Sequence, residues 1–406
     1  MFSVFFLCLL TGPLHAADFT PVTRAVDDFV NSGKLAGLSV LIKHGDDEEF
    51  YIERGYADIE RQRLLRRDSI FRIYSNTKAL TSAAALMLWE EGHYDLHDPV
   101  TRYLPELATL RVYAGENEDG SLRTVPLERP PTIRELFTHS AGFAYGLRDD
   151  HPVDRAYREL DIFNRGTLDL EALLDLLISV PLRSQPGEEW YYSLSIDILG
   201  RLIEVWSGQP LDTFLAERLL VPLGMSDTGF HVPADKLSRV ATVYSPDQTG
   251  KLVPGDLRPW DVAVPPALLS GGGGLLSTID DYMKFLSMIA ADGTTVNGTR
   301  LLQPRTVDMM RMNQLSRTVM QGPVINSAGG EYGHGLGFAV LLDPGALGID
   351  TSPGEYFWGG AADTLYWLDP ERDLIVVAMT QHWTTGERVP LRDTLRSAVS
   401  EARGER

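Results

Sequence analysis

The chain contains a single cysteine among its 406 residues, at position 8. One thiol excludes an intrachain disulfide framework and a metal centre built from several cysteines. No apolar run after the N-terminal segment is long enough to cross a bilayer, so stable membrane insertion is not expected. Basic residues are also few, because 37 Lys and Arg stand against 56 Asp and Glu and give a formal net charge of -19. A surface of this sign repels phosphate backbones, which argues against nucleic acid as a partner.

The N-terminal segment has the outline of a secretory signal peptide. Apolar residues run from Phe2 to Leu10, helix-breaking Gly12 and Pro13 follow, and small residues stand at Ala16 and Ala17. The apolar run is not preceded by lysine or arginine, which departs from the usual pattern. We therefore expect a signal peptide over the first 17 residues and a periplasmic or secreted protein. The alternative is a cytoplasmic protein with an unusual leader.

The hydrophobicity pattern places strands near both ends and helices between them. Two alternating runs at 38–43 and 49–57 predict a hairpin with its turn at residues 45–47. Further strands are expected at 335–342, 364–368 and 374–380, and helices at 19–29, 78–91, 132–138, 170–180, 195–207, 211–220, 279–289 and 389–402. These predict an α/β fold with one sheet built from both termini. The sheet domain would comprise 18–72 and 325–406, and a mainly helical domain 73–324.

The first chemical signal is Ser75-Asn76-Thr77-Lys78 at the start of a predicted helix. Residues three apart share one helical face, about 5–6 Å apart at Cβ, so the lysine amine can reach the serine hydroxyl. A serine becomes a useful nucleophile when a neighbouring base removes its proton, and a desolvated lysine can do this. The helix N-terminus adds partial positive charge. On this pattern alone, Ser75 could instead cap the helix and Lys78 could lie at the surface.

Two further segments have functional character. A Pro-Gly turn at 186–187 leads through Tyr192 into a predicted helix, and a phenol at a loop–helix junction can join a proton network. Tyr192 could equally be a packing tyrosine. Trp358-Gly359-Gly360 precedes the strand at 364–368, where glycines let a substrate approach the backbone closely. The alternative there is a β-bulge with a packed tryptophan.

Together these segments resemble the serine β-lactamase and penicillin-binding-protein superfamily, in particular its class C-like branch. The resemblance covers nearly the whole chain after the leader and includes the blocks at 132–142, 186–200, 222–225 and 271–277. It implies a β-lactamase-like fold: an antiparallel sheet flanked by helices, with an inserted helical domain. It also implies Ser75 as nucleophile, Lys78 and Tyr192 as its partners, and the N–H groups of Ser75 and Ala361 as the oxyanion hole. It implies neither a metal nor an organic cofactor.

Two departures from the superfamily pattern bear on the substrate. Leu194 stands where the Y-x-N motif has asparagine, and Trp358-Gly359-Gly360 replaces the Lys-Thr-Gly box. These replacements resemble the family VIII carboxylesterases. The resemblance implies a small-molecule ester substrate with a short acyl group, bound by Leu194, Trp358, Gly359 and Gly360. A β-lactamase or D-Ala peptidase, an acyltransferase of the same fold, and an inactive lactamase-like binding protein remain alternatives.

Other enzyme and metal sites find little support. No serine has glycine two positions before and after it, so the Gly-x-Ser-x-Gly elbow of an α/β-hydrolase is missing. His93 and His97 have a chelating spacing, but no His-Glu-x-x-His motif accompanies them. His139 is expected to be a structural hydrogen-bonding residue, and the glycine run at 271–274 to bring backbone close to the cleft floor.

Overall fold

The computed structural model describes residues 18–45, 48–146, 151–160, 162, 168–255, 260–325, 330–384 and 388–404. The signal peptide expected over the first 17 residues and most of the turn expected at 45–47 lie outside the described residues.

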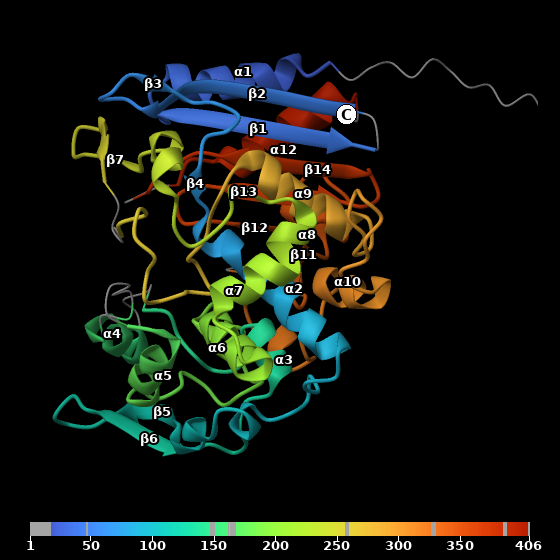
Figure 1. The fold of residues 1–406 in the computed structure, drawn as a ribbon. Helices are drawn as coiled ribbons and strands as arrows, with labels where there is room; N and C mark the ends of the chain where they lie inside the picture. The colour runs from blue at the N-terminus through green and yellow to red at the C-terminus, as the bar shows by residue number, and fades with distance from the viewer. Residues whose placement is uncertain are drawn as a thin grey trace, which may run out of the picture.

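One antiparallel sheet of eight strands dominates the upper part of the molecule in Figure 1. Its strands, in spatial order, are β10 (Tyr332–His334), β11 (Ala339–Leu341), β12 (Tyr356–Gly359), β13 (Leu365–Asp369), β14 (Leu374–Met379), β1 (Gly37–His44), β2 (Glu48–Asp58) and β3 (Arg63–Leu64). All eight come from the two terminal segments, as expected. β1 joins the two sets, because it pairs with β2 on one side and with β14 on the other.

Both faces of the sheet are covered by helices, and the alternation of side chains along the strands matches this. In β14, residues 374, 376 and 378 pack in one hydrophobic cluster and residues 375, 377 and 379 in another. Helices α1 (Thr20–Asn31) and α12 (Leu391–Ala402) pack together over the first face. Helix α9 (Ile279–Ala290) covers the other face beside β1 and β14.

The larger cluster continues from the sheet into the helical part of the molecule. At its centre is α2 (Thr77–Glu90), whose residues from Thr77 to Leu88 are all buried. The helices around and below it are α3 (Ile133–Phe137), α4 (Pro152–Glu159), α5 (Leu170–Ile178), α6 (Ser195–Ser207), α7 (Leu211–Leu215), α8 (Val221–Leu223) and α10 (Pro304–Arg311). The four-residue helix α11 (Pro344–Leu347) follows β11. Because α2 packs directly against α6, the segments that enter these two helices are brought together.

Three short strand pairs lie outside the main sheet. They are β5 (Arg111–Glu116) with β6 (Leu122–Pro126), β7 (Tyr244–Pro246) with β8 (Leu252–Pro254), and β4 (Phe71–Arg72) with β9 (Leu276–Ser277). The last pair matters for the site, because it ties the chain before Ser75 to the chain after the glycine run.

Most expected elements are confirmed, with three corrections. The strand expected at 335–342 is reduced to the short strand β11, because residues 335–338 form a turn and β10 lies before the expected range. Strand β12, which contains Trp358, was not expected, and the strand expected at 364–368 is β13. Helix α9 lies within the segment assigned to the helical domain but packs on the sheet beside β1 and β14. The reason is its apolar face, which carries Tyr282, Phe285 and Leu286.

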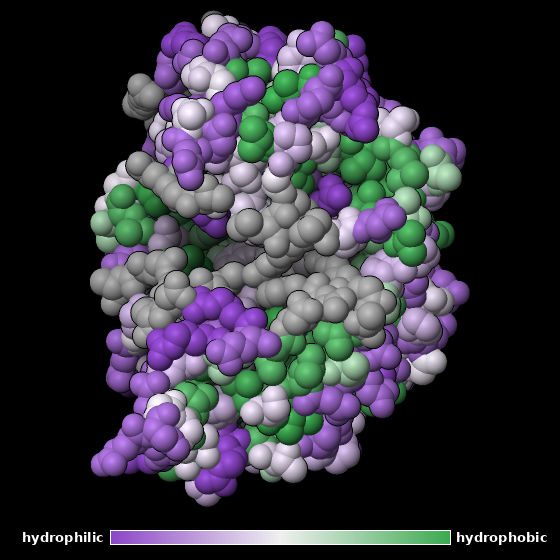
Figure 2. Space-filling model, turned by 90° about the vertical axis from the view of Figure 1, so that its left-hand side faces the viewer, coloured by the Kyte–Doolittle hydropathy of each residue, from purple (hydrophilic) through white to green (hydrophobic). Residues whose placement is uncertain are grey.

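On the face shown in Figure 2, hydrophilic residues predominate and hydrophobic ones form smaller groups between them. Within the described residues, no helix has the length and apolar character needed to span a membrane.

Candidate active site

Ser75 lies in a single 3-10 turn, Tyr74–Asn76, that leads directly into α2. Tyr74 before it has a φ of 43°, in the left-handed region that residues other than glycine seldom adopt. Its ring is held edge-on by Trp260 and Trp383, with centroids 5.6 and 5.3 Å away. A strained backbone held by packing is common at functional sites, and here it presents Ser75 at the start of the helix.

Tyr192 meets Ser75 directly. Its phenol donates a hydrogen bond of 2.6 Å to Ser75 Oγ, across 117 positions of sequence. The segment before α6 runs along residues 139–144, because Tyr191 N–H donates to the His139 carbonyl and Leu194 N–H to the Ala144 carbonyl. These backbone bonds place Tyr192 independently of its own side chain.

Lys78 is buried beneath this hydrogen bond, with 4% of its surface exposed. Its ammonium group lies 4.7 Å from the centre of the Tyr192 ring and 5.2 Å from that of Tyr145. The two rings are stacked, with centroids 5.2 Å apart. Nζ donates a 2.5 Å hydrogen bond to the carbonyl of Gly272. Cation–π contacts and one carbonyl therefore replace the water that the amine loses on burial.

The glycine run reaches Lys78 because its residues have no side chains. A Cβ on Gly271 would lie 2.8 Å from the Ile196 carbonyl, and one on Gly272 would lie 2.3 Å from Asp197 Oδ2. These distances are shorter than side chains tolerate, so glycine is required for the run to pass between α2 and α6. The run therefore brings its backbone into contact with Lys78.

The end of β12 approaches Ser75 from the sheet. A Cβ on Gly360 would lie 2.5 Å from the carbonyl of Ile73, two residues before Ser75. The next residue, Ala361, makes no hydrogen bond through its N–H to any described residue. On β12 itself, the ring of Trp358 lies 5.4 Å from that of Tyr192. Trp358, Gly360 and Ala361 are therefore adjacent to the serine and its tyrosine.

Leu194 is not placed as a substrate contact would be. It directly precedes α6 and is 2% exposed, packed in the main hydrophobic core. The sequence interpretation made this side chain a substrate contact, but it points into the core just before α6 begins. Leu194 therefore makes no contact with a substrate in this arrangement. What it changes is that the amide of the Y-x-N asparagine is missing.

An aromatic cluster with two buried histidines lies behind Tyr192. The rings of His139 and His334 have centroids 5.4 Å apart, and His139 is 5.0 Å from Tyr192. His139 Nδ1 accepts a 3.3 Å hydrogen bond from the N–H of Ser193. Burial, together with the nearby Lys78 cation, holds the pKa of His139 well below its usual value, and burial lowers the pKa of His334 to about 4. Both rings are neutral at pH 7, so the structural role expected for His139 agrees with its contacts.

Two neighbours of Lys78 have no signal in the sequence. Tyr145 follows the block at 132–142 without a recognisable motif of its own, and Gly272 contributes only a backbone carbonyl. Their position depends on contacts between segments far apart in the chain.

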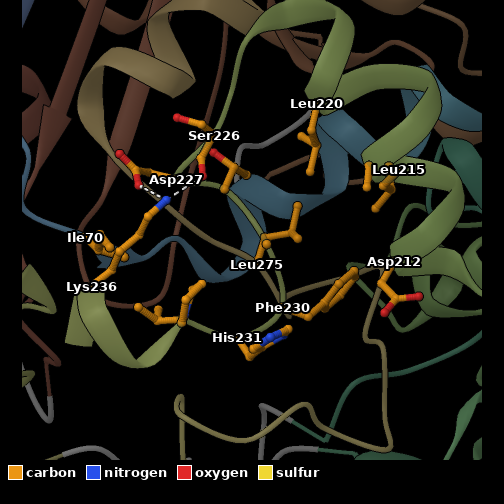
Figure 3. Close-up of a pocket in the computed structure, with 15 residues that line it drawn as sticks. Ile70, Asp212, Leu215, Leu220, Ser226, Asp227, Phe230, His231, Lys236 and Leu275 are labelled. Carbon is orange, nitrogen blue, oxygen red and sulfur yellow. Dashed lines mark hydrogen bonds and ion pairs between the residues drawn. The ribbon is translucent and has the colours of Figure 1, made fainter.

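Two cavities lie apart from Ser75. One, of about 260 Å³, is shown in Figure 3, where Leu215, Leu220, Phe230 and Leu275 surround one space and the ion pair of Asp227 with Lys236 lies at its edge. The other, of about 730 Å³, is bordered by three arginines, Arg61, Arg63 and Arg72. Among the described residues, no group of three or more His, Cys, Asp or Glu side chains is arranged to hold a metal ion.

An antiparallel sheet flanked by helices, with a serine and a lysine at the start of a central helix, defines the β-lactamase-like class of serine hydrolases and acyltransferases. The chain belongs to the Beta-lactamase family, whose model matches residues 22–400.

Among its relatives, Protein Rv1367c of Mycobacterium tuberculosis is 37% identical over 366 residues, covering 88% of each chain. Esterase EstB of Burkholderia gladioli is 31% identical over 405 residues, covering 95% of this chain and 96% of its own. The solved structure described as "EstCE1, a hydrolase with promiscuous acyltransferase activity" superposes with a TM-score of 0.76 at 28% identity, covering 93% of this chain and 97% of its own.

The buried histidines predict a loss of stability in mild acid. An unfolded histidine titrates near pH 6.5, whereas folded His334 does so near 4. The unfolded chain therefore binds more protons over this window, and stability must fall as the pH drops through it. For His334 alone, the loss in the free energy of unfolding between pH 7.5 and pH 5 should be about 2 kcal/mol.

Urea unfolding of His334→Gln at both pH values should show a smaller difference in the free energy of unfolding than wild type does. The exposed His231→Gln is the control and should match wild type; an unchanged difference in His334→Gln would contradict the assignment.

Proposed function

We propose that the protein is a serine carboxylesterase that cleaves small esters with short acyl groups through a covalent acyl-enzyme. The observation that carries this proposal is the 2.6 Å hydrogen bond from Tyr192 to Ser75 Oγ, with the Lys78 ammonium against the same ring. In the acylation step, Ser75 Oγ attacks the ester carbonyl and its proton passes to the form of the Lys78–Tyr192 pair that lacks one proton, a Tyr192 phenolate beside the Lys78 ammonium. The tetrahedral intermediate then collapses, and the alcohol leaves with a proton returned from that pair.

The backbone supplies the proposed oxyanion hole. The N–H groups of Ser75 and Ala361 would donate to the carbonyl oxygen as it becomes negative, and fixed donors of this kind stabilise a transition state strongly. The close contact of Gly360 with Ile73 supports this role, because it holds Ala361 beside the serine turn. In deacylation, Tyr192 would accept a proton from the water that attacks the acyl carbonyl, and this proton would return to Ser75 Oγ as the bond between Oγ and the acyl group breaks and the acid leaves.

An uncharged ester suits the described surroundings better than a lactam or peptide. In lactamases and peptidases, the asparagine and lysine replaced here hold the substrate's amide and carboxylate groups. Arg392 of α12 does not replace that lysine, because its guanidinium donates to the carbonyls of Trp358 and Tyr366 behind the strand. An unpaired polar group costs about 1–3 kcal/mol when it leaves water. An apolar acyl group gains free energy against Trp358 instead.

The relatives support an esterase and keep acyl transfer as a second candidate. EstB is named an esterase, and EstCE1 is described as a hydrolase with promiscuous acyltransferase activity. In both reactions the same acyl-enzyme forms, and only the acceptor differs. Turnover of an ester in the presence of a primary alcohol distinguishes them, because a transferase yields the new ester in preference to the acid. A purely binding role is disfavoured, because Ser75, Lys78 and Tyr192 are all retained and in contact or near contact.

Substrate class can be tested with chromogenic substrates. p-Nitrophenyl acetate and butyrate should be hydrolysed at least tenfold more efficiently, in kcat/KM, than a chromogenic cephalosporin or a D-Ala-D-Ala peptide. Two unpaired polar groups in the lactam account for this difference. Trp358→Lys, which restores the cation of the lactamase motif, should lower ester turnover and leave the fold intact. Efficient hydrolysis of the cephalosporin by wild type would overturn the esterase proposal.

The proton network can be tested by a double-mutant cycle. Tyr192→Phe should lower kcat by a factor of about 10²–10⁴, the range expected for lost acid–base catalysis. Lys78→Ala should be similarly impaired. The double variant should be scarcely worse than the poorer single variant, because residues that act as one unit are not additive. Losses that multiply would show that Lys78 and Tyr192 have independent roles.

A further inference from the structure

Asp197 is a buried carboxylate that has no role in the proposed reaction steps. It lies in the first turn of α6, five residues after Tyr192, and is 1% exposed. Its Oδ1 accepts hydrogen bonds from the Ser270 hydroxyl at 2.5 Å and from the N–H of Gly272 at 3.1 Å. Its Oδ2 accepts none from the described residues. Burying a carboxylate with one oxygen unpaired is costly, so a compensating interaction is expected nearby.

The hydrogen bonds of Asp197 fix one peptide of the glycine run at both ends. The N–H of the Gly271–Gly272 peptide donates to Asp197, and its carbonyl accepts a 2.8 Å hydrogen bond from Thr81 Oγ1. Thr81 is on α2, one turn after Lys78, whereas Asp197 is on α6. The two helices therefore hold this peptide from opposite sides, and the next carbonyl, that of Gly272, points at Lys78 Nζ.

Asp197 is also placed to balance the charge of Lys78. No carboxylate among the described residues lies within ion-pair distance of the Lys78 ammonium. The groups that face it are the Tyr145 and Tyr192 rings and the Gly272 carbonyl, and neutral His139 lies behind Tyr192. Asp197 contacts the same glycine as Lys78, with Oδ2 turned toward it. Asp197 and Lys78 therefore meet at one glycine residue, and a nearby negative charge stabilises a buried cation.

We propose that Asp197 is a positioning residue, which aims the Gly272 carbonyl at Lys78 and whose negative charge sets the protonation balance of the Lys78–Tyr192 pair. This inference rests on the proposed function, since it concerns the same proton network. Two substitutions separate the effect of the charge from the effect of the positioning. Asp197→Asn keeps an oxygen for the Gly272 N–H but removes the charge, whereas Thr81→Val loosens the same peptide without changing any charge.

The test is the pH dependence of kcat/KM for p-nitrophenyl butyrate, together with the pH dependence of Ser75 labelling by a fluorophosphonate. The acidic limb of either profile reports the pKa of the coupled Lys78–Tyr192 pair in the free enzyme. A negative charge raises the pKa of its neighbours, so removing it must lower that pKa. In Asp197→Asn, the acidic limb should therefore move to lower pH, by on the order of one pH unit.

The controls separate charge from packing. Thr81→Val should lower kcat several-fold and leave the limb in place. Asp369→Asn, a change to a buried carboxylate at the far end of β13, should leave both kcat and the limb as in wild type. Should Asp197→Asn not fold, Asp197→Ser is the second charge-free variant, and it should show the same shift.

The outcomes distinguish this inference from the proposed function. A reduced kcat with an unmoved limb in the charge-free variants would show a merely structural aspartate and overturn the inference alone. A wild-type protein that is neither labelled at Ser75 nor active on esters would overturn the proposed function, and the inference with it.

Discussion

The rest of the site depends on one interaction, the hydrogen bond from the buried Lys78 amine to the carbonyl of Gly272. Lys78 can lose its water only because Gly272 and two stacked tyrosine rings take its place. That arrangement requires a segment without side chains to pass between α2 and α6, and four glycines in succession provide it. It also requires the two helices to pack closely, which brings Tyr192, at the entrance of α6, to Ser75, at the entrance of α2.

The sheet contributes the other wall of the site. The part of the sheet nearest to Ser75 is the end of β12. Gly360 lets that end approach Ile73 more closely than any side chain would allow. Register along β12 and β13 then places Trp358 beside Tyr192, and the contact of Gly360 with Ile73 brings Ala361 toward the turn that contains Ser75. The site is thus assembled from two parts of the molecule. The helical part supplies the start of α2, and the sheet supplies the end of β12.

Local patterns in the sequence predicted the parts of the site that depend on local geometry. The three-residue spacing of Ser75 and Lys78 fixes their relation on a helix, and alternation along β1 and β14 predicts strands. Contacts that depend on packing could not be predicted, such as the stacking of Tyr145 on Tyr192. The burial of Leu194 could not be predicted either. Its position in the motif suggested a substrate contact, but the side chain is buried in the core just before α6. Strands β10 and β11 have three residues each, too few to show a period.

The central claim is that an acyl group is held on Ser75 during turnover, and its most direct test is mass spectrometry of the quenched enzyme. Tyr192→Phe, which should slow deacylation, is mixed with p-nitrophenyl butyrate and quenched in acid during the first turnovers. The account predicts that the intact protein gains the mass of one butyryl group, and that peptide mapping places this group on the peptide containing Ser75. A butyryl group on any other residue, or sustained ester turnover with no acylated protein at any quench time, would contradict the account.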